Sequence, residues 1–194
     1  MRYLNEREVG FDPERLGFPS ISGCLALVYV TENGLFGFHN AGGSANDQWA
    51  PRSVFFGNFV RNHFLGGRPG RRVYGATFAH RYGPPFRDNW RGELAAYGGS
   101  VGFHGAIRGY DLSAAGLPGS AYVEFRKVGP KCEIWIKPWN DHDRTTGPLD
   151  ARMHHKWIKR DGGGHYSLEE VAAQIVTNVT TAGLLRVHST RLRH

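Results

Sequence analysis

Short apolar runs separated by turn-forming residues recur along the chain, and this pattern predicts a protein rich in β-strands. The clearest run is 24–30 (CLALVYV), which is β-branched, aromatic and short enough for a buried strand. Residues 31–34 (TENG) are typical of a hairpin turn, and 35–39 (LFGFH) is the predicted return strand.

A second hairpin is predicted in the middle of the chain. Apolar and polar side chains alternate in 121–127 (AYVEFRK), and Gly129-Pro130 then turns the chain. Alternate residues of 131–137 (KCEIWIK) form one apolar face, as expected for the returning strand. Further strands are expected at 73–80, 100–110 and 184–189.

Helical patterns occur in three places. Residues 48–64 and 88–97 each carry apolar side chains at helical spacing. The strongest pattern lies in 167–182, where Ser167 and Glu170 match a capping box and an apolar stripe follows. This segment is expected to form the best helix of the chain.

The remaining segments are polar. Residues 1–20 are interpreted as an irregular N-terminal lead-in, and residues 138–166 as a long loop. About seven strands and two or three helices, with no repeat and no linker, predict an α+β or sandwich-like fold. A single catalytic domain is expected over residues 21–194.

The hydrophobic content indicates a folded domain, and the net charge bears on the kind of partner it could bind. Of the 194 residues, 40% are hydrophobic and 13% aromatic, which is enough for a core and unlike a disordered chain. The net charge of +7 is spread along the chain, and a solvated basic surface is the simpler interpretation; the alternative is an acidic partner, such as nucleic acid, an anionic lipid surface or an acidic protein face. No stretch is apolar enough to span a bilayer.

Targeting and redox signals are sparse. Residues 1–17 are charged and lack the apolar core of a cleavable signal, so we expect a cytoplasmic protein or export by another route. The two cysteines are too few for a disulfide framework, although a single Cys24–Cys132 bridge is an alternative to two free thiols.

Cys24 and His39 form a candidate nucleophile and base. A catalytic thiol must be ionised beside a base and must be reachable. Gly23 allows a sharp chain entry that can expose the sulfur, and the amides of Gly23 and Cys24 can converge as an oxyanion hole. The alternative is structural, because free cysteine is most often a small buried hydrophobe.

The length of the turn decides whether the two side chains meet. With a four-residue loop, Val30 pairs with Leu35, and His39 lies opposite Ala26, diagonal to Cys24 on the same sheet face. A two-residue turn keeps the face but moves Cys24 a step further away. A three-residue loop turns His39 to the other face.

The layout Ser22-Gly23-Cys24, strand, glycine turn, strand and His39 resembles the core of the cytotoxic necrotizing factor family. It is also similar to dermonecrotic-type toxins, to the Burkholderia lethal factor and to the chemotaxis receptor deamidase CheD. The resemblance covers Ser20 to Gly43. It implies a β-sandwich of mixed sheets with flanking helices and a protein-glutamine deamidase activity.

The resemblance also implies roles for individual residues. Cys24 would be the nucleophile and His39 its base, with no cofactor. In one relative a threonine orients the histidine, but this chain has Phe18 at that position. The orienting group is therefore left open among side chains near the pair and a main-chain carbonyl. The candidate side chains are Ser20, Ser22 and Asn40.

By the same resemblance, the protein would be a bacterial effector or toxin, a virulence-associated hydrolase with transglutaminase side activity. It would be secreted without a cleavable signal peptide and would act in the cytoplasm of a target cell. Its partners would be a protein with an accessible glutamine and an inhibitor or immunity protein.

Two other features support the alternative of a nucleic-acid-binding or metal-dependent nuclease domain. Residues 139–157 contain Asp and His residues of metal-ligand type, although their spacing matches no compact motif and a polar surface loop is the simpler interpretation. Strand aromatics, Tyr74, Phe78, Phe103 and Trp135, are candidates for base stacking. His104 is expected in the core or lining a cleft.

Overall fold

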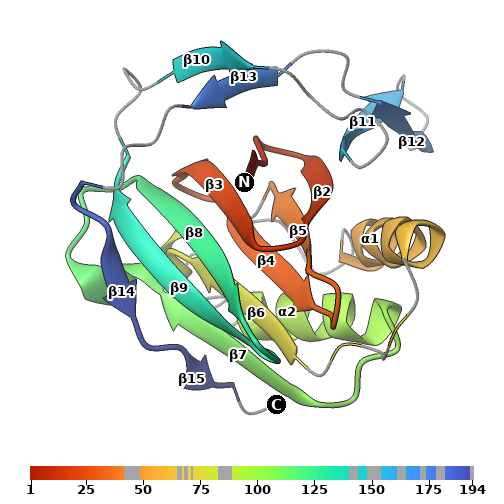
Figure 1. Ribbon diagram of the computed structural model, residues 1–194, viewed down its shortest axis with the longest axis horizontal. Coiled ribbons are helices and arrows are strands. Elements are labelled where there is room, and N and C mark those ends of the chain that lie inside the picture. Colours follow the sequence, from red (N-terminus) through yellow and green to blue (C-terminus); the bar gives the residue numbers. More distant parts are fainter. Residues whose placement is uncertain are drawn as a thin grey trace.

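The structure is a computed structural model. It describes residues 1–41, 49–64, 67, 70, 72–82, 89–139, 144–147, 154–160, 165–170, 174–177 and 182–192. Two α-helices and mixed β-sheets form one domain, so the predicted α+β class is confirmed (Figure 1).

The large sheet has eight strands and runs through the middle of the fold. In spatial order they are β12 (His165–Glu170), β11 (His154–Arg160), β2 (Glu8–Asp12), β5 (Leu35–Asn40), β4 (Leu25–Val30), β6 (Arg72–Thr77), β7 (Ala106–Asp111) and β15 (Thr190–Arg191). Neighbouring strands are antiparallel except β6 and β7, which are parallel.

The small sheet has five strands. In spatial order they are β1 (Arg2–Tyr3), β3 (Arg15–Ile21), β8 (Ala121–Val128), β9 (Lys131–Pro138) and β14 (Leu185–Val187). β10 (Arg144–Gly147) and β13 (Gln174–Thr177) form a separate antiparallel pair. Short 3-10 turns, η2 (Ala79–Tyr82) and η3 (Leu112–Ala115), follow β6 and β7.

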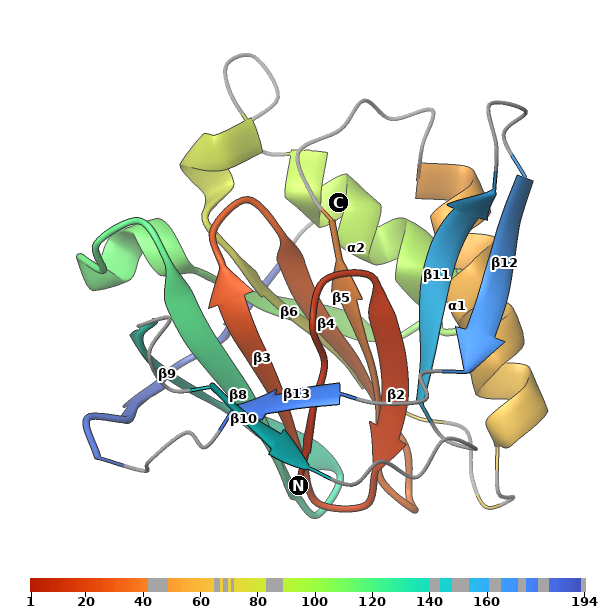
Figure 2. The same cartoon turned by 90° about the horizontal axis from the view of Figure 1, so that it is seen from above.

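The elements stack in three layers. Helices α1 (Trp49–His63) and α2 (Asn89–Ser100) cover one face of the large sheet, and the small sheet covers the other (Figures 1 and 2). Side chains of β4 alternate between the two interfaces: Leu25 and Leu27 pack toward the helices, whereas Ala26 and Val28 pack toward the small sheet. A strand buried on both faces explains why 24–30 is apolar throughout.

The register of the first hairpin matches the four-residue loop. Val30 pairs with Leu35 and Ala26 with His39. Thr31 closes the loop, because its amide donates to the Gly34 oxygen at 2.8 Å. The two-residue and three-residue alternatives are therefore wrong for this turn.

The prediction of an irregular lead-in over residues 1–20 is wrong. This segment forms β1, β2 and β3, and all five residues of β2 are buried. Charged residues at the turns made the segment look polar in the sequence. In β2, Val9 and Phe11 face the helices, and in β3, Leu16 and Phe18 face the large sheet. The sheets, rather than local propensity, order the segment.

The helix predicted over 167–182 is also wrong. The chain forms β12 and β13 there, and β12 pairs with β11. Three of the four residues of β13 are β-branched and fit a pleated strand better than a helix, whereas β12 contains no such residue and depends on its pairing with β11. Because β10 and β11 lie within 138–166, that segment is not one continuous loop.

The two other helices are confirmed. The helix expected over 48–64 is α1, and the one over 88–97 is α2, which continues to Ser100. The strand predicted from residue 100 consequently begins only at Ala106. Within the described residues, no helix combines the length and apolarity needed to cross a bilayer.

Replacing Gly37 by alanine should destabilise the fold, because a Cβ there would lie 2.6 Å from Leu16 Cδ1 and 2.9 Å from Leu4 Cδ1. Overpacking of this kind costs about 1–3 kcal/mol of unfolding free energy. Urea denaturation followed by circular dichroism measures the loss. Gly99→Ala is the matched control, since a Cβ there meets nothing within 4 Å and alanine favours the helix. Equal stability of the two variants would contradict the packing described.

Candidate active site

Cys24 and His39 lie on one face of the large sheet, toward the small sheet. Cys24 directly precedes β4 and belongs to the core between the sheets. His39 pairs with Ala26, so Cys24 occupies the diagonal position, about 7–8 Å away between backbones and within side-chain reach. The geometry inferred from the four-residue turn is thus present in the fold.

A main-chain oxygen orients the imidazole. Nδ1 of His39 lies 2.8 Å from the carbonyl oxygen of Leu4. Because a carbonyl only accepts hydrogen bonds, Nδ1 carries the proton, and in the neutral ring Nε2 carries the lone pair. Nε2 is buried and has no hydrogen-bond partner among the described residues. The Cys24 thiol is therefore not hydrogen-bonded to Nε2 in this structure, and the lone pair of this buried nitrogen is unused.

The N-terminal segment holds this carbonyl in place. The Leu4 amide donates to the Gly17 oxygen at 2.8 Å, and the Arg7 amide donates to the His39 oxygen at 2.7 Å. Phe18 packs against the imidazole, with ring centroids 6.1 Å apart. Phe18 thus packs against one side of the imidazole, and the Leu4 carbonyl, rather than a side chain at position 18, accepts its hydrogen bond.

The burial of His39 sets its charge. Only 1% of the residue is exposed, and burial lowers the pKa of the imidazole. The Leu4 carbonyl and the carboxylates of Glu6 and Glu8 act in the opposite direction but do not outweigh burial. His39 is therefore neutral near pH 7, which is the protonation state that a general base requires.

The backbone around Cys24 is fixed, and the preceding residue, Gly23, borders open space. Thr77 Oγ1 donates to the Cys24 carbonyl oxygen at 2.8 Å, tying the start of β4 to the end of β6. Cys24 is 9% exposed, and a Cβ built on half-buried Gly23 would meet no atom within 4 Å. Space next to the thiol is therefore found beside Gly23, the residue that precedes it.

None of the three candidate orienting side chains forms a hydrogen bond with His39. Ser20 is exposed, with φ of 58°, at the irregularity in the β3–β8 pairing. Ser22 is half-buried beside Gly23. Asn40 faces the helices instead, where it donates to Glu93 and accepts from Arg52 Nη1 at 3.2 Å. Asn40 therefore does not orient the imidazole, because adjacent strand residues face opposite ways.

His104 was expected in the core or lining a cleft, and this expectation is wrong. It is exposed in the connection between α2 and β7. Its neighbour Phe103 packs on Tyr29 at the opposite end of β4 from Cys24, on the helix side. His104 therefore does not line the Cys24–His39 site.

The second cysteine differs from the first. Cys24 and Cys132 are both free thiols, so the alternative disulfide is not formed. Burial, assisted by the Glu133 carboxylate, raises the pKa of the Cys132 thiol well above its usual value. Cys132 is consequently protonated and unreactive, and it provides an internal reference for the reactivity of Cys24.

The structure describes only some of the residues on which the nucleic-acid-binding or nuclease alternative depends. Tyr74, Phe78 and Phe103 are buried in the core and cannot stack on bases, and half-buried Trp135 lies under Arg126. Among the described residues, no group of three or more His, Cys, Asp or Glu side chains could hold a metal ion. The side chains of 140–157, which the metal-site hypothesis needs, lie outside the described residues.

Comparison of the chain with known protein families, characterised proteins and solved structures gives no match. The case for a function therefore depends on the geometry of the site.

The group that the sequence did not identify is the Leu4 carbonyl. A main-chain oxygen has no side-chain signature, and Leu4 lies in the segment interpreted as irregular. The available signal was the alternation of buried residues around Val9 and Leu16, which would have predicted strands packed against the hairpin.

Replacing His39 should change how stability depends on pH. Its pKa is lower in the folded protein than its unfolded value of about 6.5, so the unfolded chain takes up the proton first as pH falls. The wild-type free energy of unfolding should therefore decline below about pH 6.5, with a slope of up to 1.4 kcal/mol per pH unit from this residue. In His39→Gln that contribution should vanish. Urea denaturation between about pH 5 and 7 compares the slopes, and identical slopes would contradict a buried neutral His39.

Proposed function

We propose that this domain is a cysteine-dependent amidohydrolase that converts glutamine side chains of another protein to glutamate. The observation that supports the proposal most directly is the hydrogen bond from His39 Nδ1 to the Leu4 oxygen, beside Cys24 on the same sheet face. It leaves a neutral Nε2 to accept the thiol proton. The resemblance of the Ser22-Gly23-Cys24…His39 layout to cysteine deamidases agrees with the same chemistry.

The first half of the reaction forms a thioester. His39 Nε2 takes the proton of Cys24, and the thiolate attacks the carboxamide carbon of the substrate. The amides of Gly23 and Cys24 are the proposed donors to the oxyanion that develops. When the tetrahedral intermediate collapses, the C–N bond breaks and the imidazolium protonates the departing ammonia.

The second half restores the enzyme. His39, neutral again, deprotonates a water molecule that attacks the thioester carbonyl. The C–S bond breaks, Cys24 leaves as thiolate and recovers its proton, and the product is glutamate. The net change is addition of water and release of ammonia, so no cofactor is needed. A primary amine in place of water would give a transglutaminated product.

Access to the thiol favours a long side chain as substrate. Cys24 is nearly buried and the adjacent Gly23 borders open space, so a carboxamide on a flexible stem fits the site better than a main-chain amide. The excess positive charge of the chain favours docking to an acidic face of the target. Secretion without a cleavable signal, action in the cytoplasm of a target cell and an inhibitor protein remain predictions from the resemblance.

Incubation of the protein with cell extract should produce glutamine-to-glutamate changes that depend on Cys24. Peptide mass spectrometry would detect each change as a gain of about one dalton, and Cys24→Ser should abolish the signal by removing the nucleophile. His39→Gln should reduce the rate by at least about 100-fold, because the thiol loses its base. Cys132→Ser is the matched control and should retain activity.

Two outcomes would contradict this proposal. One is a set of glutamate products that persists in Cys24→Ser. The other is equal loss of activity in Cys132→Ser and Cys24→Ser when both variants remain folded by circular dichroism.

A further inference from the structure

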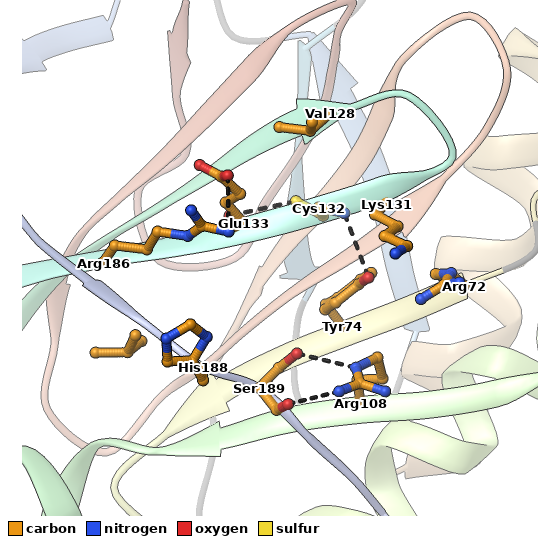
Figure 3. A pocket seen from close by; sticks show the side chains of 11 residues that line it. Arg72, Tyr74, Arg108, Val128, Lys131, Cys132, Glu133, Arg186, His188 and Ser189 are labelled. Atoms are coloured by element: carbon orange, nitrogen blue, oxygen red, sulfur yellow. Dashed lines mark hydrogen bonds and ion pairs between the residues drawn. The ribbon is translucent and has the colours of Figure 1, made fainter.

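A basic pocket lies at the far end of the interface between the two sheets (Figure 3). Its volume is 320 Å³, and β6 and β7 of the large sheet and β9 and β14 of the small sheet line it. Thr77 of β6 contacts Cys24, whereas Arg72 of the same strand lines the pocket. Five residues of extended strand separate the two by about 16 Å, so the pocket is distinct from the candidate active site.

The lining of the pocket is strongly positive. Its charged residues, apart from His188, are Arg72, Arg108, Lys131, Arg186 and Glu133. Four permanent cations against one carboxylate leave a formal charge of +3 around a concave space. Low-dielectric walls strengthen such a field, and the site therefore favours an anion.

Two of these cations are held in place by the protein. Arg108 donates from Nε to Ser189 Oγ at 3.0 Å and from Nη2 to the Ser189 oxygen at 2.7 Å. Arg186 forms an ion pair with Glu133 at 3.0 Å. These contacts fix the segment between β14 and β15 as one wall of the pocket.

The two other cations lack an acidic partner. The side chains of Arg72 and Lys131 make no hydrogen bond or ion pair with any residue that the structure describes. They come from different sheets, and Figure 3 shows their charged ends on the same side of the pocket. Two unpaired cations that converge on one space are arranged to share a ligand with more than one negative charge.

A buried hydroxyl adds a further donor. Tyr74 is 2% exposed, and its hydroxyl oxygen accepts a hydrogen bond from the Cys132 amide at 3.3 Å. That bond leaves the hydroxyl proton free to be donated to a ligand in the pocket. Cations in several directions together with a neutral donor suit a tetrahedral oxyanion with many acceptor atoms.

We propose that this pocket binds a small phosphorylated molecule that carries at least two negative charges. The volume is at the lower end of the range for small-molecule sites and exceeds what one phosphate group fills. Apart from the His188 ring, the aromatic group in the lining is Tyr74, which is buried and offers no face for base stacking. The pocket is therefore better suited to phosphoryl groups than to a nucleic-acid strand.

The test is calorimetric titration of the full chain with inorganic pyrophosphate at constant ionic strength. We expect saturable one-to-one binding, weakened about tenfold or more in Arg72→Gln and in Lys131→Gln, because each removes a charge-assisted contact. Lys131 is exposed, so Lys131→Gln and the charge reversal Lys131→Glu should both fold, and the reversal should abolish binding.

Matched controls separate this site from general charge effects and from catalysis. Arg91 is an exposed cation on α2, across the large sheet from the pocket, and Arg91→Gln should leave the affinity unchanged. Cys24→Ser should also bind normally, so failure of the deamidase proposal leaves this result intact. The proposal is overturned by absence of saturable binding at millimolar pyrophosphate or by equal weakening in Arg91→Gln. It is also overturned if malonate, a dicarboxylate, binds as tightly as pyrophosphate.

Discussion

The candidate active site depends on one buried hydrogen bond, from His39 Nδ1 to the main-chain oxygen of Leu4. It fixes the orientation of the ring and the position of its proton, and it leaves Nε2 with an unused lone pair on the sheet face that also carries Cys24. The bond exists because residues 1–20 fold as strands that pack over the hairpin. Gly37, which has no side chain, gives Leu4 and Leu16 the room to approach β5. The packing of the N-terminal strands and the proposed chemistry at Cys24 therefore both depend on the position of Leu4.

Strand β5 carries two polar arrangements, one on each face. His39 points toward the small sheet, whereas Asn40 points toward the helices and joins Arg52 of α1 to Glu93 of α2. The second arrangement anchors both helices to the end of the strand that bears His39. Arg52 Nη1 also donates to the Ala41 oxygen, which follows the strand directly, although Arg52 Nε has no hydrogen-bond partner among the described residues.

The sequence predicted those elements whose signal is local. The turn at 31–34 located its hairpin, although the sequence left three loop lengths open and only the structure decides the register, and alternation identified β8 and β9. The segment 167–182 was misassigned because its capping box is local whereas the pairing of β12 with β11 is not. The Leu4 carbonyl and the Arg72–Lys131 pocket could not be predicted, since both unite residues that are distant in the chain and only the packed sheets bring them together.

The Cys24–His39 pair and the basic pocket occupy opposite ends of one interface between sheets, so the proposed catalytic site and the proposed anion site do not overlap. The central claim, that His39 activates Cys24, is tested most directly by the alkylation rates of the two cysteines with iodoacetamide near pH 7, resolved by peptide mass spectrometry. We predict that Cys24 reacts at least about tenfold faster than Cys132 and that His39→Gln removes the difference. Slow and equal modification of both thiols in the wild-type protein would contradict the account.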